Sequence, residues 1–230
     1  MLASLRCRRL GSPAHLALAV MLAAPAPHGR VVPPDVAVVR NVAYGTDPKQ
    51  RFDVYVPRGA RNAAVVLMVH GGAWRIGDKR SRGVVENKVA HWSRGGIVVI
   101  SVNYRMLPGT DPVEQARDVA RALAAAQRRM SEWGGDAGSV VLMGHSAGAH
   151  LVALLDANPT LATSLGARTW LGAVIDAADR FAVRATSLGV RAEVLPVAKS
   201  HAAIDAELGA PGAYTEAVDT FLRSLGIQTS

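Results

Sequence analysis

Short apolar runs recur along this chain of 230 residues and alternate with longer stretches of helical periodicity. They cover residues 63–69, 97–102, 140–143 and 171–175. Strands that are buried on both faces have this pattern, because helices cover each side of a parallel sheet. Two further strands are predicted, over residues 52–56 and over residues 191–195. The alternation predicts one α/β domain over residues 31–230, built on a doubly wound and mostly parallel sheet.

The spacing of apolar residues predicts helices between these strands. One covers residues 112–130, and a second begins directly after Ser146 and ends before Pro159, since proline does not continue a helix. Residues 179–188 are predicted as a short helix. The last helix spans residues 214–225 and is closed by a glycine.

Residues 1–26 have the parts of a secretory signal peptide: three arginines, an apolar run over residues 16–24 and an Ala-Pro-Ala ending. We expect this segment to be removed and the mature protein to be exported to the periplasm or the medium. The alternative is an uncleaved N-terminal anchor, because Pro25 and Pro27 crowd the cleavage point. The apolar run is too short to span a bilayer comfortably, so no stable membrane span is expected in the mature form. The single cysteine, Cys7, lies in this segment, so disulfides are not expected either.

The charge and the motif content exclude several classes of function. The formal net charge is +8, and without the three leader arginines the mature chain carries +5. Its other arginines are scattered, with no dense basic run and no interleaved aromatic residues, so a nucleic-acid partner is not expected. The sequence contains no HExxH, no His-x-His pair and no phosphate-binding glycine loop. We therefore expect neither a metal nor a cofactor.

Residues 144–148 read Gly-His-Ser-Ala-Gly and follow a predicted buried strand directly before a predicted helix. A nucleophile elbow requires this context, because the turn is sharp enough to strain the serine backbone and to demand small neighbours. Both residues two positions from Ser146 are glycine. The start of the following helix also places a positive dipole end where negative charge develops. The pattern predicts Ser146 as a nucleophile, and the plainer alternative is a glycine-rich turn with an incidental serine.

Residues 70–74 read His-Gly-Gly-Ala-Trp and come immediately after the apolar run 63–69. Glycines allow the backbone to approach a substrate closely, so the amides of Gly71 and Gly72, together with the amide of Ala147, are predicted to form an oxyanion hole.

His201 is the predicted general base. In a chain of this type the base follows the nucleophile and lies near the strand ends. Only His150 and His201 follow Ser146, and His150 is carried away from the serine by the helix that begins there. The alternative for His201 is a surface or capping histidine.

With these residues in place, the chain resembles the esterase and carboxylesterase branch of the α/β-hydrolases. The matching stretches are residues 70–74, the Asn-Tyr-Arg of residues 103–105, residues 144–150 and the segment 200–225. Within that branch it is similar to small bacterial esterases and to kynurenine-formamidase-like enzymes. The resemblance implies hydrolysis of a small-molecule carboxylic ester, or of a small amide such as an aryl formamide, through an acyl-enzyme and without a cofactor.

The chain also departs from that branch, because only 55 residues separate Ser146 from His201. Members of the branch usually place a strand, a cap region and an aspartate in this interval, commonly over about a hundred residues. The predicted α/β-hydrolase sheet is therefore shortened between nucleophile and histidine. The rival hypothesis is a non-catalytic or degenerate hydrolase-fold protein that lacks a complete triad.

If the triad is complete, Asp176 is the predicted acid. It directly follows the strand over residues 171–175, and the acid stands at the carboxyl end of a strand in this fold. The other acids between nucleophile and histidine are Asp156 at the far end of the elbow's helix, Asp179 at a predicted helix start and Glu193 within a predicted strand. The alternative for Asp176 is a helix-capping aspartate.

Overall fold

The computed structural model describes residues 32–176 and 199–229. The predicted leader over residues 1–26, the predicted helix over residues 179–188 and the predicted strand over residues 191–195 lie outside the described residues. The elements, in chain order, are β1 (Val36–Ala43), β2 (Arg51–Pro57), β3 (Ala63–Val69), α1 (Arg82–Arg94), β4 (Val98–Val102), α2 (Pro112–Arg129), the 3₁₀ turn η1 (Met130–Trp133), β5 (Gly135–His145), α3 (Ala147–Ala157), α4 (Pro159–Thr163), β6 (Gly172–Asp176), α6 (His201–Glu207) and α7 (Ala213–Ser224).

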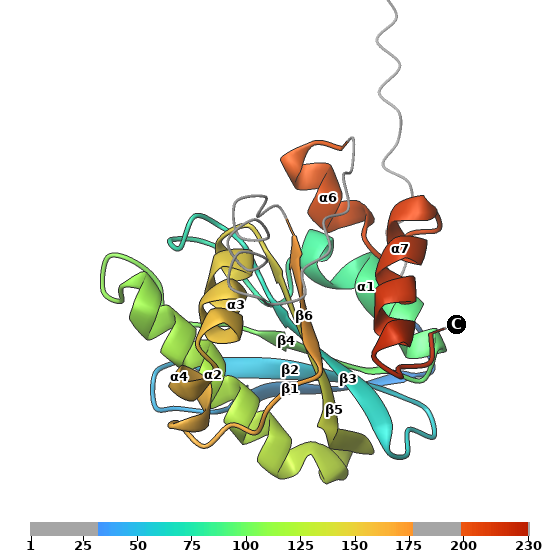
Figure 1. Cartoon of the computed structure of the whole chain (residues 1–230), viewed down its shortest axis with the longest axis horizontal. Helices are drawn as coiled ribbons and strands as arrows, with labels where there is room; N and C mark the ends of the chain where they lie inside the picture. Colours follow the sequence, from blue (N-terminus) through green and yellow to red (C-terminus); the bar gives the residue numbers. More distant parts are fainter. Residues whose placement is uncertain (1–31, 177–198, 230) are drawn as a thin grey trace, which may run out of the picture.

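The six described strands form one sheet in the order β1-β2-β4-β3-β5-β6 (Figure 1). Strands β4, β3, β5 and β6 run parallel to one another, whereas β1 and β2 are antiparallel to their neighbours. The prediction of a mostly parallel, doubly wound sheet is confirmed. Because the four parallel strands point the same way, their carboxyl ends meet at one edge of the sheet, and ligand sites of open α/β folds lie outside such an edge.

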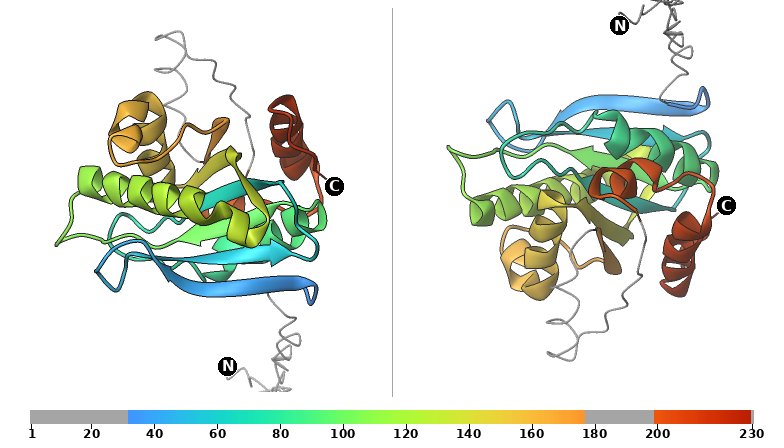
Figure 2. Two further views of the ribbon diagram at one scale, coloured as in Figure 1. Left: turned by 90° about the horizontal axis from the view of Figure 1, so that it is seen from below. Right: turned by 90° about the horizontal axis from the view of Figure 1, so that it is seen from above.

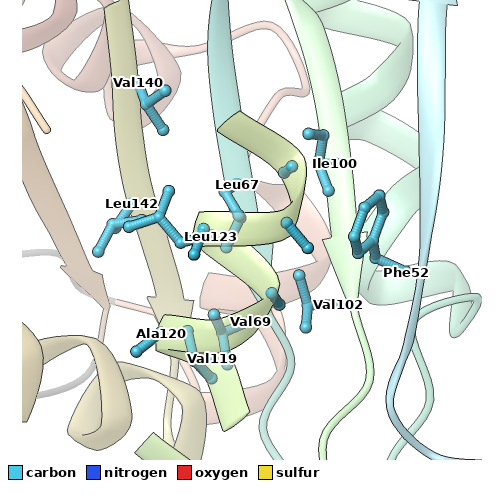
Figure 3. Packing of buried hydrophobic residues seen from close by; sticks show 14 of the residues in the cluster. Phe52, Leu67, Val69, Ile100, Val102, Val119, Ala120, Leu123, Val140 and Leu142 are labelled. Atoms are coloured by element: carbon cyan, nitrogen blue, oxygen red, sulfur yellow. The ribbon is translucent and has the colours of Figure 1, made fainter. Parts of the chain in front are cut away.

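Strand β3 shows why the apolar runs are continuous. Its alternate residues Val65 and Leu67 belong to one buried cluster, while Val66 and Met68 belong to the cluster on the opposite face. Helices α2 and α3 cover the first face, and α1 and α7 cover the second (Figure 1). Figure 3 shows the first cluster, in which α2 packs across the strands with Val119, Ala120 and Leu123 over Phe52, Leu67, Val69, Ile100, Val102, Val140 and Leu142.

Helix α2 lies within one residue of its predicted bounds because its ends carry clear signals. The carboxylate of Asp111 accepts hydrogen bonds from the amides of Val113 (2.8 Å) and Glu114 (3.0 Å), and Pro112 occupies the first helical position. At the other end the 3₁₀ turn η1 follows α2 directly, and the helical backbone ends at Gly134, which has a left-handed φ of 68°.

Strand β1 and helix α1 are among the elements without a sequence prediction, and each departs from simple patterning for a physical reason. Strand β1 is a half-exposed edge strand, so no apolar run marks it. Helix α1 buries Lys88 together with Val85, Val89 and Trp92, so a polar residue interrupts its apolar stripe. Strand β2 is also an exception, because its charged residue Asp53 is fully buried and pairs with the Lys79 ammonium at 2.7 Å.

Helix α6 lies beside α1, and α7 follows it over the same face of the sheet (Figure 2). Among the helices of residues 32–176 and 199–229, none combines the length with the apolar character that crossing a bilayer requires.

Candidate active site

Ser146 stands between the last residue of β5 and the first residue of α3 with φ 52° and ψ −116°. A residue with a side chain pays of order 1–3 kcal/mol in such a conformation, so the surrounding structure must enforce it. The strand, the turn and the helix therefore have the arrangement that holds a serine hydroxyl above the end of a sheet.

The two glycines that flank this turn are required by close backbone contacts. A Cβ atom on Gly148 would lie 2.1 Å from the Val69 carbonyl oxygen and 2.6 Å from that of His70. A Cβ atom on Gly144 would lie 2.4 Å from the Gly148 carbonyl oxygen. All three distances are far below van der Waals contact, and the obstructing atoms are backbone, so neither position accepts a side chain without displacing the elbow.

The loop after β3 lies directly against the elbow. A Cβ atom on Gly71 would lie 3.1 Å from Cβ of Ser146 and 3.0 Å from the His145 carbonyl oxygen. Gly72 has a φ of 122°, and Ala73 and Trp74 follow with φ values of 50° and 61°. Three successive residues thus have left-handed backbone in a segment where strain has to be offset by other contacts.

The first amides of α3 complete this region. Ala147 is the first residue of α3, and the first turn of a helix leaves amide donors without an intrahelical acceptor. The loop of Gly71 and Gly72 and the first turn of α3 therefore both lie next to Ser146, beside the positive end of a helix dipole.

The buried ring of His70 supports this loop from below. Its Nδ1 lies 2.7 Å from the Gly71 carbonyl oxygen, which can only accept, so Nδ1 carries the proton. Burial lowers the pKa of His70, which keeps the ring neutral. The ring stacks on Tyr104 with 4.6 Å between centroids, and the Tyr104 hydroxyl donates to the His70 carbonyl oxygen at 2.9 Å. A Cβ atom on Gly77 would lie 2.3 Å from Nδ1 of His70, so a glycine there makes room for the ring.

Trp74 ties the far end of the loop to two other elements. Its carbonyl oxygen accepts from the amide of Leu107 at 2.9 Å and from Nε2 of Gln115 at 3.1 Å. Its indole meets the ring of His150 edge to face at 5.5 Å. His150 lies on α3 and is exposed. Partial burial of its ring lowers the pKa of His150.

Arg105 anchors the segment that carries Tyr104. Its guanidinium makes two hydrogen bonds to the buried carboxylate of Asp118 on α2, at 2.8 Å and 2.7 Å. Burial alone would raise the pKa of Asp118, but hydrogen bonds from Arg105 and Gln50 outweigh it, so the net pKa is lowered and the carboxylate stays charged. The residues 103–105 thus connect α2 to the loop beside Ser146.

Asp176 is the last residue of β6 and the register partner of His145 on β5. Its backbone carbonyl oxygen accepts a hydrogen bond from the Ser146 amide at 3.1 Å. Its carboxylate, which is buried, lies 3.3 Å from Nδ1 of His145. Asp176 therefore contacts the elbow with both its backbone and its side chain.

His201 is the first residue of α6 and is exposed. Its ring lies 4.8 Å from the ring of His145, measured between centroids. His145 therefore contacts Asp176 on one side and His201 on another. Within residues 32–176 and 199–229, no hydrogen bond joins the His201 ring to Asp176 or to Ser146.

The sequence reasoning missed His145, because it considered only histidines that follow the nucleophile. The one available signal was its place in the motif directly before Ser146, which alone does not show that its side chain points toward β6. The structure brings no three His, Cys, Asp or Glu side chains together as a metal site would need, within the ranges it describes.

The model of the BD-FAE family, an α/β-hydrolase esterase family, matches residues 52–173, just over half of the chain. The chain belongs to the BD-FAE family. The matched segment runs from β2 to β6 and contains the loop 70–74 and the elbow. This confirms the predicted α/β-hydrolase type of fold.

The chain is similar to proteins named as a methylesterase and as a formamidase. It is 35% identical over 117 residues to the probable isoprenylcysteine alpha-carbonyl methylesterase ICME of Oryza sativa, covering 50% of this chain and 28% of that protein. It is 32% identical over 116 residues to the kynurenine formamidase of Salmo salar, covering 50% of this chain and 37% of that protein. The chain thus spans well under half of either relative.

A solved structure agrees with this BD-FAE fold. Esterase B from Lactobacillus rhamnosis superposes with a TM-score of 0.52 and 29% sequence identity, covering 62% of this chain and 48% of that one.

The close contacts at Gly148 lead to a prediction for stability. We expect Gly148→Ala to lower the free energy of unfolding by about 3 kcal/mol or to prevent folding, because its methyl group would overlap the Val69 carbonyl oxygen. Gly138→Ala in β5 is the control, since its Cβ atom would be 3.4 Å from the nearest atom. Urea unfolding measures both, and the control is expected within about 0.5 kcal/mol of wild type. An unaltered midpoint for Gly148→Ala would contradict the packing of α3 against β3.

Proposed function

We propose that the protein is a serine hydrolase that cleaves carboxylic esters through an acyl-enzyme on Ser146. The observation that carries this proposal is the strained φ of 52° at Ser146, in a turn between a strand and a helix. The glycines two residues away on either side are required, because neither position has room for a Cβ atom. Strain of this kind is retained where it serves a site. The similarity to a methylesterase and to esterase B supports the choice of an ester bond.

In the proposed mechanism Oγ of Ser146 attacks the ester carbonyl carbon while His201 takes the hydroxyl proton. The amides of Gly71, Gly72 and Ala147 donate to the oxyanion of the tetrahedral intermediate. As the intermediate collapses, the C–O bond to the alcohol breaks, and His201 returns the proton to the departing alkoxide. A water molecule then attacks the acyl-enzyme with His201 again as base, which releases the acid and restores Ser146.

Asp176 is proposed as the acid that supports this proton transfer. Its carboxylate contacts His145 at 3.3 Å, and the His145 ring in turn packs against the His201 ring. A negative charge at this position would stabilise the positive charge that develops on the neighbouring imidazole during the reaction.

A second candidate function is hydrolysis of an aryl formamide or another small amide. The observation in its favour is the 32% identity to the kynurenine formamidase of Salmo salar. The same serine, oxyanion donors and base would serve both bonds, because each reaction passes through a tetrahedral oxyanion.

Covalent labelling tests the nucleophile. We expect a fluorophosphonate probe to label Ser146, and Ser146→Ala to abolish labelling and to lower turnover of a short p-nitrophenyl ester by at least about a thousandfold. Ser139→Ala, in β5, is the control and should behave as wild type, since its hydroxyl donates to Asp136 near the start of that strand. Equal turnover by wild type and Ser146→Ala would support the non-catalytic alternative.

The role of Asp176 is tested by an isosteric change. We expect Asp176→Asn to lower kcat by at least about a hundredfold, because the negative charge next to His145, whose ring packs against the His201 ring, is lost. The melting temperature should change little, since the backbone contact to Ser146 remains. Asp156→Asn is the control, because its side chain accepts a hydrogen bond from Trp170 and the asparagine keeps that acceptor. Wild-type kcat in Asp176→Asn would remove Asp176 from the mechanism.

A substrate panel separates the two candidate functions. If the protein is an esterase, kcat/KM for p-nitrophenyl acetate should exceed that for aryl formamides, because the ester has the more electrophilic carbonyl and the better leaving group. The reverse order in initial-rate assays would favour the formamidase alternative. Ser146→Ala should abolish both activities under either outcome.

A further inference from the structure

Helix α6 carries His201 but has no buried side chain of its own. It covers residues 201–207, a length at which a helix is not stable in isolation. Its position must therefore be fixed by contacts at its ends.

Two consecutive residues of α1 satisfy the carboxyl end of α6. Nζ of Lys88 donates to the backbone carbonyl oxygen of Asp205 and also to its carboxylate, at 2.8 Å for the latter. Nδ2 of Asn87 donates to the carbonyl oxygen of Ala206 at 2.7 Å. The last carbonyl groups of a helix have no intrahelical donor, so these side chains supply a cap from another element.

The ammonium group of Lys88 is saturated by these contacts. It has three N–H donors, and its third acceptor is the carbonyl oxygen of Gly83 at 2.8 Å. The side chain is only 4% exposed, and burial lowers the pKa of Lys88, while the Asp205 carboxylate opposes that shift. A cation at the carboxyl end of α6 also meets the negative end of its dipole.

The chain just after α6 is packed equally closely on α1. Leu208 is fully buried, and a Cβ atom on Gly209, whose φ is 92°, would lie 2.6 Å from the Asn87 carbonyl carbon. The cavity between Lys88, Asp205, His145 and Asp176 encloses only about 10 Å³, roughly enough for one water molecule. All three donors of Lys88 are thus used by contacts within the protein.

We infer that Asn87 and Lys88 form a clamp that holds the carboxyl end of α6 and thereby positions His201 for proton exchange with Ser146. This inference rests on the proposed function, and both clamp residues are positioning residues, because they act through α6. The clamp is defined by the contacts of Asn87 and Lys88 with Asp205 and Ala206.

Steady-state kinetics test the clamp in the full chain. We expect Lys88→Met combined with Asn87→Ala to lower kcat for a p-nitrophenyl ester by about 10- to 100-fold, with KM within about twofold of wild type, because a base displaced by an ångström slows the chemical step. Added imidazole should restore part of this activity, as it should for His201→Ala. Arg82→Met is the control, since it removes the exposed ion pair with Glu86 on the same helix without touching α6. An unchanged kcat per folded molecule, measured with the folded fraction from circular dichroism, would overturn the inference.

Amide hydrogen exchange tests the clamp without reference to activity. In the double variant, exchange over residues 201–207 should accelerate at least about tenfold, while α7 keeps its protection; unchanged exchange in α6 would overturn the clamp. If wild type and Ser146→Ala hydrolyse the ester equally, the proposed function fails, and the exchange result alone then decides whether Asn87 and Lys88 hold α6.

Discussion

The geometry of the candidate site depends on a close backbone contact between α3 and β3 that leaves no room for a side chain. The first turn of α3 approaches the carboxyl end of β3 so closely that a Cβ atom on Gly148 would lie 2.1 Å from the Val69 carbonyl oxygen. The loop 70–74 continues directly from that strand end. The same contact therefore fixes the nucleophile and the predicted oxyanion donors relative to each other, and it does so through backbone atoms that have little freedom to relax.

Buried polar groups hold the outer side of this arrangement. A continuous path runs from the loop to α2. The ring of His70 stacks on Tyr104 and its carbonyl oxygen accepts from the Tyr104 hydroxyl. The next residue along the chain, Arg105, donates two hydrogen bonds to Asp118. In the ion pair of this path the Asp118 carboxylate is fully buried while the Arg105 side chain is 31% exposed, so removal of Arg105 would leave an uncompensated buried charge. The contacts of this path hold one end of the loop in which Gly72, Ala73 and Trp74 have left-handed backbone, and the Leu107 amide holds the other end.

The parts predicted from the sequence are those set by local chemistry. The apolar run of β3, the capped start of α2 and the glycines around Ser146 each carry their signal within a few residues. The parts not predicted depend on contacts between residues far apart in the chain. Lys88 and Asp205 are separated by 117 positions, and the burial of Lys88 hides the apolar stripe of α1. The contact between Asp176 and His145 likewise follows from the register of β5 with β6, which no local pattern specifies.

The two halves of the proposed site are held by different means. The carbonyl oxygen of residue 176 reaches the Ser146 amide through parallel strand register, so any residue at that position would make the contact. The carboxylate of Asp176, by contrast, meets His145 only because that position is acidic. The nucleophile and oxyanion donors are thus fixed by backbone, whereas proton transfer depends on side chains and on α6, which reaches the site through polar contacts with α1. A change in the contacts between α6 and α1 can therefore alter the position of the base while leaving the elbow intact.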